Sequence, residues 1–293
     1  MHTSARFSQS VLQRSVRLGT FVMFLAIAGA LGLLAYTNSA IENLQAQEKR
    51  ELVSRHIDRQ AKSLIVDINS MSIWDEAYRE LNDKPKLDWV DLNVGAYFAN
   101  YMHHDVSLVV GSQGQALYGW AGDRRTDARD QARLLASAAE LIADLREKEE
   151  VLIRQDGAVR AAGIASSVSA SGMIQTDRGT YLAAATTVVP ETLTTPRRVG
   201  RDPIVLSAVK IGGPFLAELQ ESLGVQGARL EPIGVGTSKT AVLLRDQRGA
   251  PLGVLAWSQT FAGLSALRRV APLVLLGFLA FWAANIVDRK SVV

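Results

Sequence analysis

An uncharged run of 19 residues near the N-terminus, LGTFVMFLAIAGALGLLAY (18–36), most constrains what this chain can fold into. As an α-helix the run extends roughly 28 Å, close to the thickness of the hydrocarbon core of a bilayer. A cleaved signal peptide has a shorter apolar region with small residues before the cut, whereas Asn38-Ser39-Ala40 follows here. The sequence therefore predicts an uncleaved membrane anchor over residues 18–37.

A second uncharged run, VAPLVLLGFLAFWAANIV (270–287), lies near the other end of the chain. Pro272 is compatible with the first turn of a helix, because an amide at that position has no helical partner. The alternative is a buried core helix, but 18 uncharged residues are long for one. We therefore expect a second transmembrane helix and contact of both runs with a lipid bilayer.

The basic residues near the first uncharged run predict the orientation of the chain across the membrane. Arg6, Arg14 and Arg17 precede the first run and no acidic residue does, so the positive-inside rule places residues 1–17 in the cytoplasm. Two spans then place residues 38–269 outside, in the periplasm of a bacterium. Arg268 and Arg269 lie on the outer side against the rule, which weakens for long translocated loops.

The last six residues, DRKSVV (288–293), match the translation of a common sequencing adapter. We therefore expect the natural chain to depart from this sequence after about Val287, with a cytoplasmic part missing.

Composition excludes several functions. The chain has no cysteine, which excludes disulfides, thiolate catalysis and cysteine-ligated zinc. Its net charge is +3, but seven of the 32 basic residues lie at the two ends, so the middle is slightly acidic. No nucleic-acid binding is expected from such a distribution.

The outer segment shows the pattern of an α+β domain. Residues 38–81 contain no Gly or Pro and predict one long helix, with a 4-3-4-3 spacing of mostly apolar residues from Ile57 to Tyr78. This helix either packs on its own domain or also pairs with a second copy in a homodimer. Helices are also predicted over 88–101, 127–148 with Asp127 as N-cap, and 214–223 closed by Gly224.

Strands are predicted from apolar runs that flank glycine-containing turns. Hairpins are expected over 106–120, 151–165 and 241–257, and single strands over 181–189 and 204–211. Together they predict one or two small antiparallel sheets with helices on one side. The stretch TLTTPRRVGRDP (192–203) is the best candidate for a mobile loop.

The order of these features resembles the CHASE4 family of bacterial extracytoplasmic sensor domains. The resemblance rests on the proximal helix running into WDEAY (74–78), the aromatic and Asn-containing stretch 88–101, the strand, turn and strand of 106–120, and DQRGAPLGVLAW (246–257). It implies a fold related to Cache and PAS sensors. It also implies an output module after the second span, either a cyclic-di-GMP enzyme or a histidine kinase, which this chain lacks.

One cluster is a candidate wall of a ligand pocket. Trp74, Asp75 and Tyr78 fall within about one helical turn, so they are either core packing with a polar edge or a surface for a small-molecule ligand. In the second case Asp75 recognises an amine or a hydroxyl by a charge-assisted hydrogen bond. The opposite wall is then supplied by Asn93, Tyr97, Asn100 and Tyr101, which helix surface and core edge explain equally well.

Two other motifs are weaker. His103-His104-Asp105 offers no third ligand at a metal-binding spacing, so no metal or other cofactor is expected. Ser207 and Lys210 match the S-x-x-K of penicillin-recognising enzymes but lie in a strand-like run, without S-D-N or K-T-G. They are the only candidates for a tethered enzyme.

The sequence thus predicts the ligand-sensing and transmembrane half of a bacterial receptor, without a catalytic domain. The alternatives are a membrane-tethered extracytoplasmic enzyme or a scaffold that only dimerises.

Overall fold

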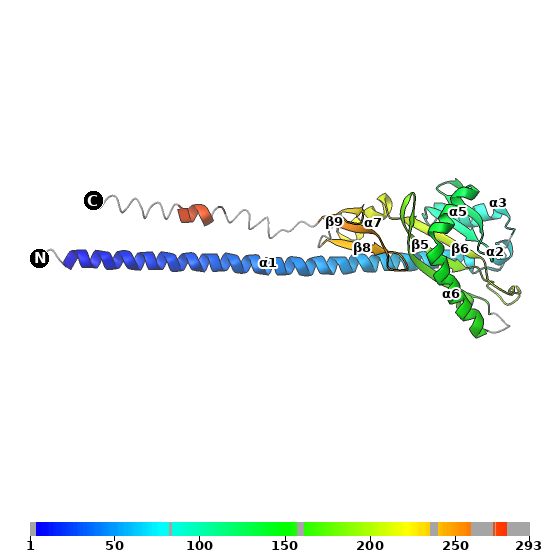
Figure 1. The fold of residues 1–293 in the computed structure, drawn as a ribbon, viewed down its shortest axis with the longest axis horizontal. Coiled ribbons are helices and arrows are strands. Elements are labelled where there is room, and N and C mark those ends of the chain that lie inside the picture. The colour runs from blue at the N-terminus through cyan, green and yellow to red at the C-terminus, as the bar shows by residue number, and fades with distance from the viewer. Residues whose placement is uncertain are drawn as a thin grey trace. The chain divides into compact units, whose positions relative to one another are not determined.

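The computed structural model describes residues 4–81, 84–156, 161–234, 240–258, 272 and 274–279. They form two units, residues 1–48 with 259–293, and residues 49–258, which are described separately (Figure 1). In the first unit, helix α1 (Ser4–Ser72) begins and carries the first uncharged run. Most of the second predicted span, 270–287, lies outside the described residues, although residues 272 and 274–279 are helical.

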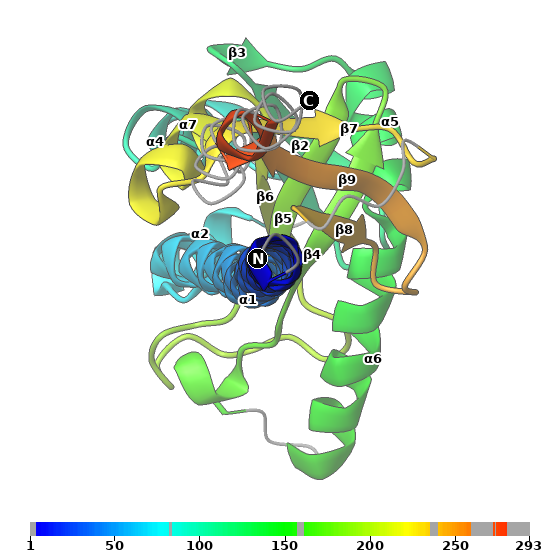
Figure 2. The same cartoon turned by 90° about the vertical axis from the view of Figure 1, so that its left-hand side faces the viewer.

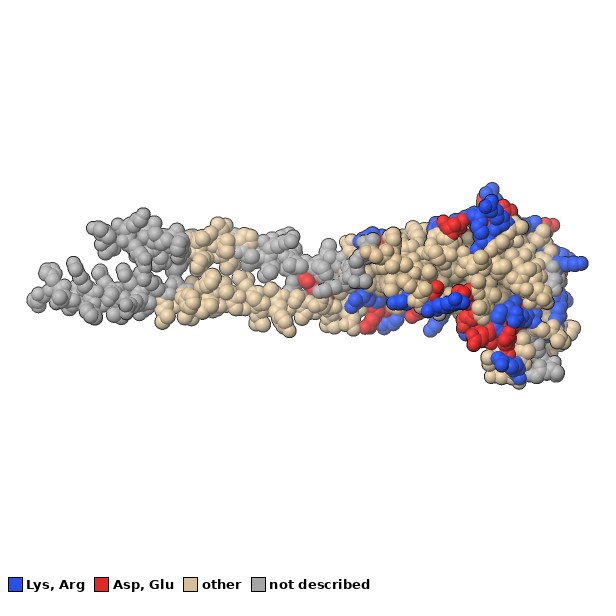
Figure 3. Space-filling model, viewed as in Figure 1, with Lys and Arg blue, Asp and Glu red and all other residues tan. Residues whose placement is uncertain are grey.

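Helix α1 contains the candidate membrane span. Among the described residues it is the one helix long and apolar enough to cross a membrane, and none of its apolar window is buried within the protein. Phe21, Leu33 and Leu34 are all more than half exposed. In Figure 3 this stretch shows an uncharged surface, while the charged side chains gather over the second unit. Such exposure of large apolar side chains is what contact with lipid requires.

The second unit is a mixed domain of helices and antiparallel sheets. Its main sheet has the order β3-β2-β1-β6-β5-β4, and a smaller sheet has the order β7-β9-β8. The strands of the main sheet are β1 (Val106–Val110), β2 (Ala116–Ala121), β3 (Arg124–Arg125), β4 (Ser169–Thr176), β5 (Gly179–Thr187) and β6 (Ile204–Lys210). Those of the smaller sheet are β7 (Gln226–Glu231), β8 (Ala241–Arg245) and β9 (Pro251–Ser258).

Helices cover both faces of the main sheet, not one face as the sequence suggested. Because neighbouring side chains in a strand point to opposite faces, Val109 packs with α1 whereas Leu108 and Val110 pack with α5 and α6. Figure 2, which looks along α1, shows strands β4 to β6 between α1 and α6. The covering helices are α2 (Asp75–Glu80), α3 (Leu87–Val90), a π-helical turn (Asp91–Gly95), α4 (Ala96–Asn100), α5 (Ala128–Ser137), α6 (Ala139–Asp156) and α7 (Gly213–Leu223). A short 3-10 turn spans Ile164–Ser166.

Several local predictions are confirmed. Asp127 caps α5, since its carboxylate accepts a hydrogen bond from the Asp130 amide at 2.8 Å. Gly224 closes α7 at φ +60°, in the left-handed region that glycine tolerates. The apolar spacing on α1 is also correct, because Ile57, Leu64 and Ile68 are all buried.

Two predictions of elements are wrong. The long helix does not reach Leu81, because Trp74 is extended at φ −158° and the Val189 amide donates to the Ser72 carbonyl, which interrupts the helical ladder. The hairpin predicted over 151–165 is absent from the described part of that range. Helix α6 continues to Asp156 because Leu141 and Leu145 anchor it on the sheet, and residues 157–160 lie outside the described residues.

Candidate functional site

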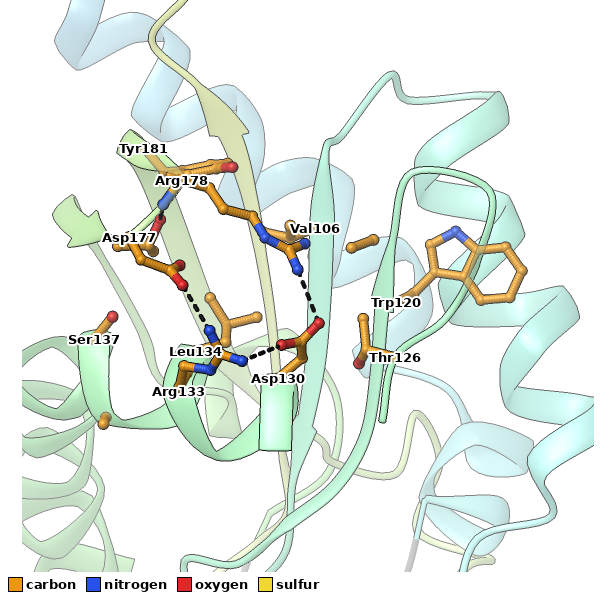
Figure 4. Close-up of a pocket in the computed structure, with 13 residues that line it drawn as sticks. Val106, Trp120, Thr126, Asp130, Arg133, Leu134, Ser137, Asp177, Arg178 and Tyr181 are labelled. Atoms are coloured by element: carbon orange, nitrogen blue, oxygen red, sulfur yellow. Dashed lines mark hydrogen bonds and ion pairs between the residues drawn. The ribbon is translucent and has the colours of Figure 1, made fainter. Parts of the chain in front are cut away.

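A cavity of about 200 Å³ lies between α5, the β1–β2 hairpin and the turn that joins β4 to β5 (Figure 4). Its floor is apolar and consists of Val106, Leu134 and the ring of Tyr181. Tyr181 is buried, and this burial raises the pKa of its hydroxyl, so the phenol stays neutral at physiological pH. Trp120 also borders the cavity, but Figure 4 shows its indole pointing away from the ion pairs of the opposite rim.

Four charged side chains of alternating sign close one side of the cavity. Arg178 Nη2 lies 2.8 Å from Asp130 Oδ2, and Arg133 lies 3.1 Å from Asp130 Oδ1 and 2.7 Å from Asp177 Oδ2. All four side chains are at least one quarter exposed, so each pair contributes only about 0–1 kcal/mol to stability. Exposed pairs of this strength can exchange a partner for a charged group of a ligand.

Local sequence explains how the rim is built. The Asp127 cap starts α5, and the helical repeat then places Asp130 and Arg133 on one side of the helix, three residues apart. Asp177 and Arg178 occupy the tight turn between β4 and β5, where Gly179 adopts φ +126°. No sequence motif marks these residues as a site; the only local signals are the Asp127 cap and the charged turn before Gly179.

The predicted cluster at the start of α2 contacts the loop of residues 190–203 and Trp89. Asp75 accepts two hydrogen bonds from Thr192, from its amide at 3.0 Å and its hydroxyl at 2.6 Å. These bonds hold the pKa of the Asp75 carboxyl below its usual value, since they favour the charged form. The Trp74 ring lies 5.6 Å from the Trp89 ring, whose nitrogen donates to Glu76.

Tyr78 completes the same contact with the loop of residues 190–203. Its buried hydroxyl accepts a hydrogen bond from the Arg198 amide at 2.7 Å, and the Arg198 guanidinium lies 5.6 Å from the ring centre. Burial raises the pKa of Tyr78, so the hydroxyl is neutral. Asp75 and Tyr78 therefore hold this loop against α2.

The contacts recorded for the residues of the predicted opposite wall lie within their own segment, 89–101. The side-chain Nδ2 of Asn93 donates to the Trp89 carbonyl at 2.9 Å, and the Tyr97 ring contacts the rings of Phe98 and Tyr101. Tyr101 is 74% exposed and Asn100 is also exposed. None of the seven predicted residues lines the cavity beside α5.

The loop of residues 190–203 is also tied to α6 by a buried charge network. Arg197 pairs with Asp202, both at most 3% exposed, and donates to the Ala161 and Ser166 carbonyls. On α6, Arg146 lies 2.6 Å from Glu149, which accepts from the Asp202 amide at 2.8 Å. The predicted mobile segment is thus a loop, but one with hydrogen bonds to elements on both faces of the main sheet.

Ser207 and Lys210 do not form a catalytic pair. They lie three residues apart on β6, so their side chains point to opposite faces. The Ser207 hydroxyl is fully buried, donates to the Val106 carbonyl and lies 2.8 Å from His104 Nδ1. Its burial leaves no access for a substrate. No cluster of three metal-ligating residues occurs within the described residues.

The comparison with protein families agrees with this architecture. Residues 56–230 match the model of the CHASE4 domain, which covers more than half of the chain, so the chain belongs to the CHASE4 family of extracytoplasmic sensor domains. No curated protein matches the chain.

Proposed function

We propose that this chain is the ligand-sensing and signal-input half of a bacterial membrane receptor, with its ligand bound in the cavity beside α5. The observation that carries the proposal is the combination, in a sensor-domain family, of an apolar floor with a rim of exchangeable ion pairs. A small-molecule site needs both features, since apolar surface supplies affinity and a few polar groups orient the ligand.

Helix α1 is the proposed route of the signal. It is continuous from Ser4 to Ser72 and therefore connects the membrane anchor with the core of the sensor domain. The proposal includes a second span over 270–287, a Cache/PAS-like fold, and an output module of the cyclic-di-GMP or histidine kinase type beyond it. A ligand shifts the equilibrium of such a receptor only by its difference in affinity for the two states.

The experiment is a thermal-shift screen of metabolite classes on the full chain in nanodiscs, repeated on a variant with a filled cavity. Ser137 lines the cavity, so Ser137→Phe should abolish the shift of a true ligand. Ala128→Phe, in the exposed first turn of α5 and away from the cavity, is the matched control. A ligand whose shift survives Ser137→Phe does not bind there.

Transmission of the signal along α1 to the membrane is tested with the same ligand. Because the chain lacks cysteine, single spin labels can be introduced in α1 and in the second predicted span. We expect the distance between the labels to change on ligand saturation. Identical distances in the empty and saturated receptor contradict the proposed route.

We also propose that two copies pair through α1. The exposed large apolar residues of α1 that follow the uncharged run 18–36 fall within about 80° of one another around the helix axis. They are Ile41, Leu44, Leu52 and Val66. The charged Arg55 and Arg59 interrupt this stripe, so the contact should concentrate between Ile41 and Leu52. Leu44→Cys should form an intermolecular disulfide in membranes, whereas Asp58→Cys should not; equal cross-linking at both positions contradicts this pairing.

A further inference from the structure

A second cleft, of about 370 Å³, lies between α1, α7 and the linker that precedes β1. On α1 it is lined by Gln60, Ser63, Leu64 and Asp67, which lie on one face over two helical turns. It is separate from the cavity beside α5, with which it shares no lining residue.

Helix α7 packs along α1 at this place. Gln60 donates to Glu218 Oε1 at 2.8 Å, and the Phe215 ring lies edge-on to His56 at 6.4 Å. Further along the two helices, Lys49 donates to the Gly224 carbonyl at 3.0 Å. A molecule in the cleft would therefore contact the helix that leads to the membrane and the helix that packs against it.

The charges of the cleft have one sign. Asp67 and Glu218 are carboxylates, and no Lys or Arg is among the described residues that line it. His104 Nε2 lies 3.4 Å from Asp67; burial lowers the pKa of this imidazole, and the Asp67 carboxylate opposes that effect.

The rest of the lining is apolar or aromatic. Met102, Leu182, Val209 and Phe215 line it. His103 also lines the cleft and is the one non-glycine residue with positive φ, at +59°, among the described residues. Such a backbone conformation is uncommon outside glycine and is often found where a side chain is held at a functional site.

We propose that the cleft between α1 and α7 binds a small organic amine, with its ammonium group attracted by the negative charges of Asp67 and Glu218 and its apolar body on Met102 and Phe215. Carboxylates bind ammonium groups by charge-assisted hydrogen bonds, and an aromatic ring adds a favourable contact with a cation. A ligand at this place acts directly on the contact between α1 and α7. The proposal does not depend on the cavity beside α5.

The test measures binding of three amine probes to the full chain in nanodiscs by calorimetry. The probes are phenethylamine, cyclohexylamine and benzylamine, and the comparison compounds are neutral 2-phenylethanol and anionic phenylacetate. We expect at least one amine to bind and neither comparison compound to do so. Absence of binding by all three amines, or a preference for phenylacetate, overturns the proposal.

Matched variants locate the site. Asp67→Asn and Glu218→Gln keep the size of each side chain, and the amide oxygen that Glu218→Gln introduces can still accept the hydrogen bond from Gln60. Each should weaken amine binding at least about tenfold, since each removes a negative charge that attracts the ammonium group. Asp58→Asn on α1 and Glu221→Gln on α7 are the controls, because both acids are exposed and lie outside the cleft.

The thermal midpoint of each variant is measured first, so that loss of binding is compared between folded proteins. Equal weakening by the control variants overturns the assignment to the cleft. Failure of this test leaves the cavity beside α5 unaffected, because Ser137→Phe probes that cavity alone.

Discussion

Tyr78 is the residue whose role differs most clearly between the sequence and the structure. Its spacing from Trp74 permits either core packing or recognition of a ligand, whereas the structure shows its hydroxyl on the Arg198 amide. That contact joins residues 120 positions apart in the chain. No local pattern in a single sequence encodes so distant a partner, so the two interpretations could not be separated before the fold was known.

Tyr78→Phe should destabilise the domain by about 1 kcal/mol, because it removes the acceptor of the Arg198 amide and keeps the buried ring. The free energy of unfolding from denaturant titration measures this. Tyr101→Phe is the control, since that side chain is 74% exposed and should change stability by less than about 0.5 kcal/mol. Equal effects of the two variants would show that the contact between Tyr78 and the loop contributes nothing.

The Thr192 amide donates a hydrogen bond to Asp75, so its protection against hydrogen exchange should depend on pH. The hydrogen bonds from Thr192 lower the pKa of Asp75 in the folded protein. The stability that the Asp75 carboxylate contributes to the folded state is therefore fully present above the ordinary carboxyl pKa, near 4. It is lost as the pH falls through the lowered folded value. Hydrogen exchange should show constant Thr192 protection from pH 7 to 5 and a decrease below about pH 4. Asp75→Asn should reduce protection at neutral pH and remove this dependence; a dependence unchanged in the variant contradicts the role.

Glu149 and Glu150 on α6 allow a matched comparison of a buried acid with an exposed one. Glu149 is fully buried between Arg146 and the Asp202 amide, whereas the side chain of Glu150 is 50% exposed and pairs with Arg201. Glu149→Ala should cost about 3–5 kcal/mol, because it leaves Arg146 buried without its carboxylate. Glu150→Ala should cost about 0–1 kcal/mol. Thermal and urea unfolding of both variants measures the difference, and similar costs would contradict a structural role for the buried network.

At the scale of elements, caps and apolar periodicity were reliable where the signal was local. Asp127 and Gly224 mark real helix ends because capping involves residues only a few positions apart. The hairpin expected over 151–165 is wrong in its described part, because the sequence cannot show that α6 packs on the sheet through Leu145. Strand β4 was missed because its small and polar residues lack an apolar alternation, and pairing with β5 determines its conformation.

The π-helical turn before α4 depends on a close approach of its last residue to the sheet. A Cβ added at Gly95 would overlap the Tyr118 hydroxyl and the Trp120 indole. Tyr118 is fully buried and donates to Asp91 at 2.8 Å, so it cannot move without losing that bond. Gly95→Ala should therefore cost about 1–3 kcal/mol.

The matched control for this element is Gly213→Ala, in the first turn of α7. A Cβ there meets no atom within 4 Å, and alanine favours a helix over glycine, so the variant should be neutral or up to about 1 kcal/mol more stable. Chemical denaturation of both variants gives the comparison. A Gly95→Ala protein as stable as Gly213→Ala would show that the packing of the turn on β2 is looser than the structure indicates.

At the scale of the whole molecule, the sequence predicted the family, the mixed class of fold and an N-terminal helix able to cross a membrane, but not the cavity beside α5. The anchor follows from 19 uncharged residues in a row, which need no knowledge of tertiary contacts. The cavity beside α5 requires that a helix, a hairpin and a turn converge, with Asp130 facing Arg178 from 48 positions away. Sites of this kind are built by topology and therefore become visible only with the fold.

A sensor domain placed outside the cytoplasm should be accessible to a reagent that cannot cross the membrane. The chain contains no cysteine, so a single introduced thiol reports its own side of the membrane. Asp58→Cys lies on an exposed position of α1 within the sensor domain, and Ser10→Cys lies among the basic residues before the anchor. A membrane-impermeant maleimide added to spheroplasts should label Asp58→Cys and leave Ser10→Cys unlabelled until the membrane is opened. The orientation follows from the positive charge before the first span, so the reverse pattern would place the sensor domain inside and contradict the proposed receptor topology.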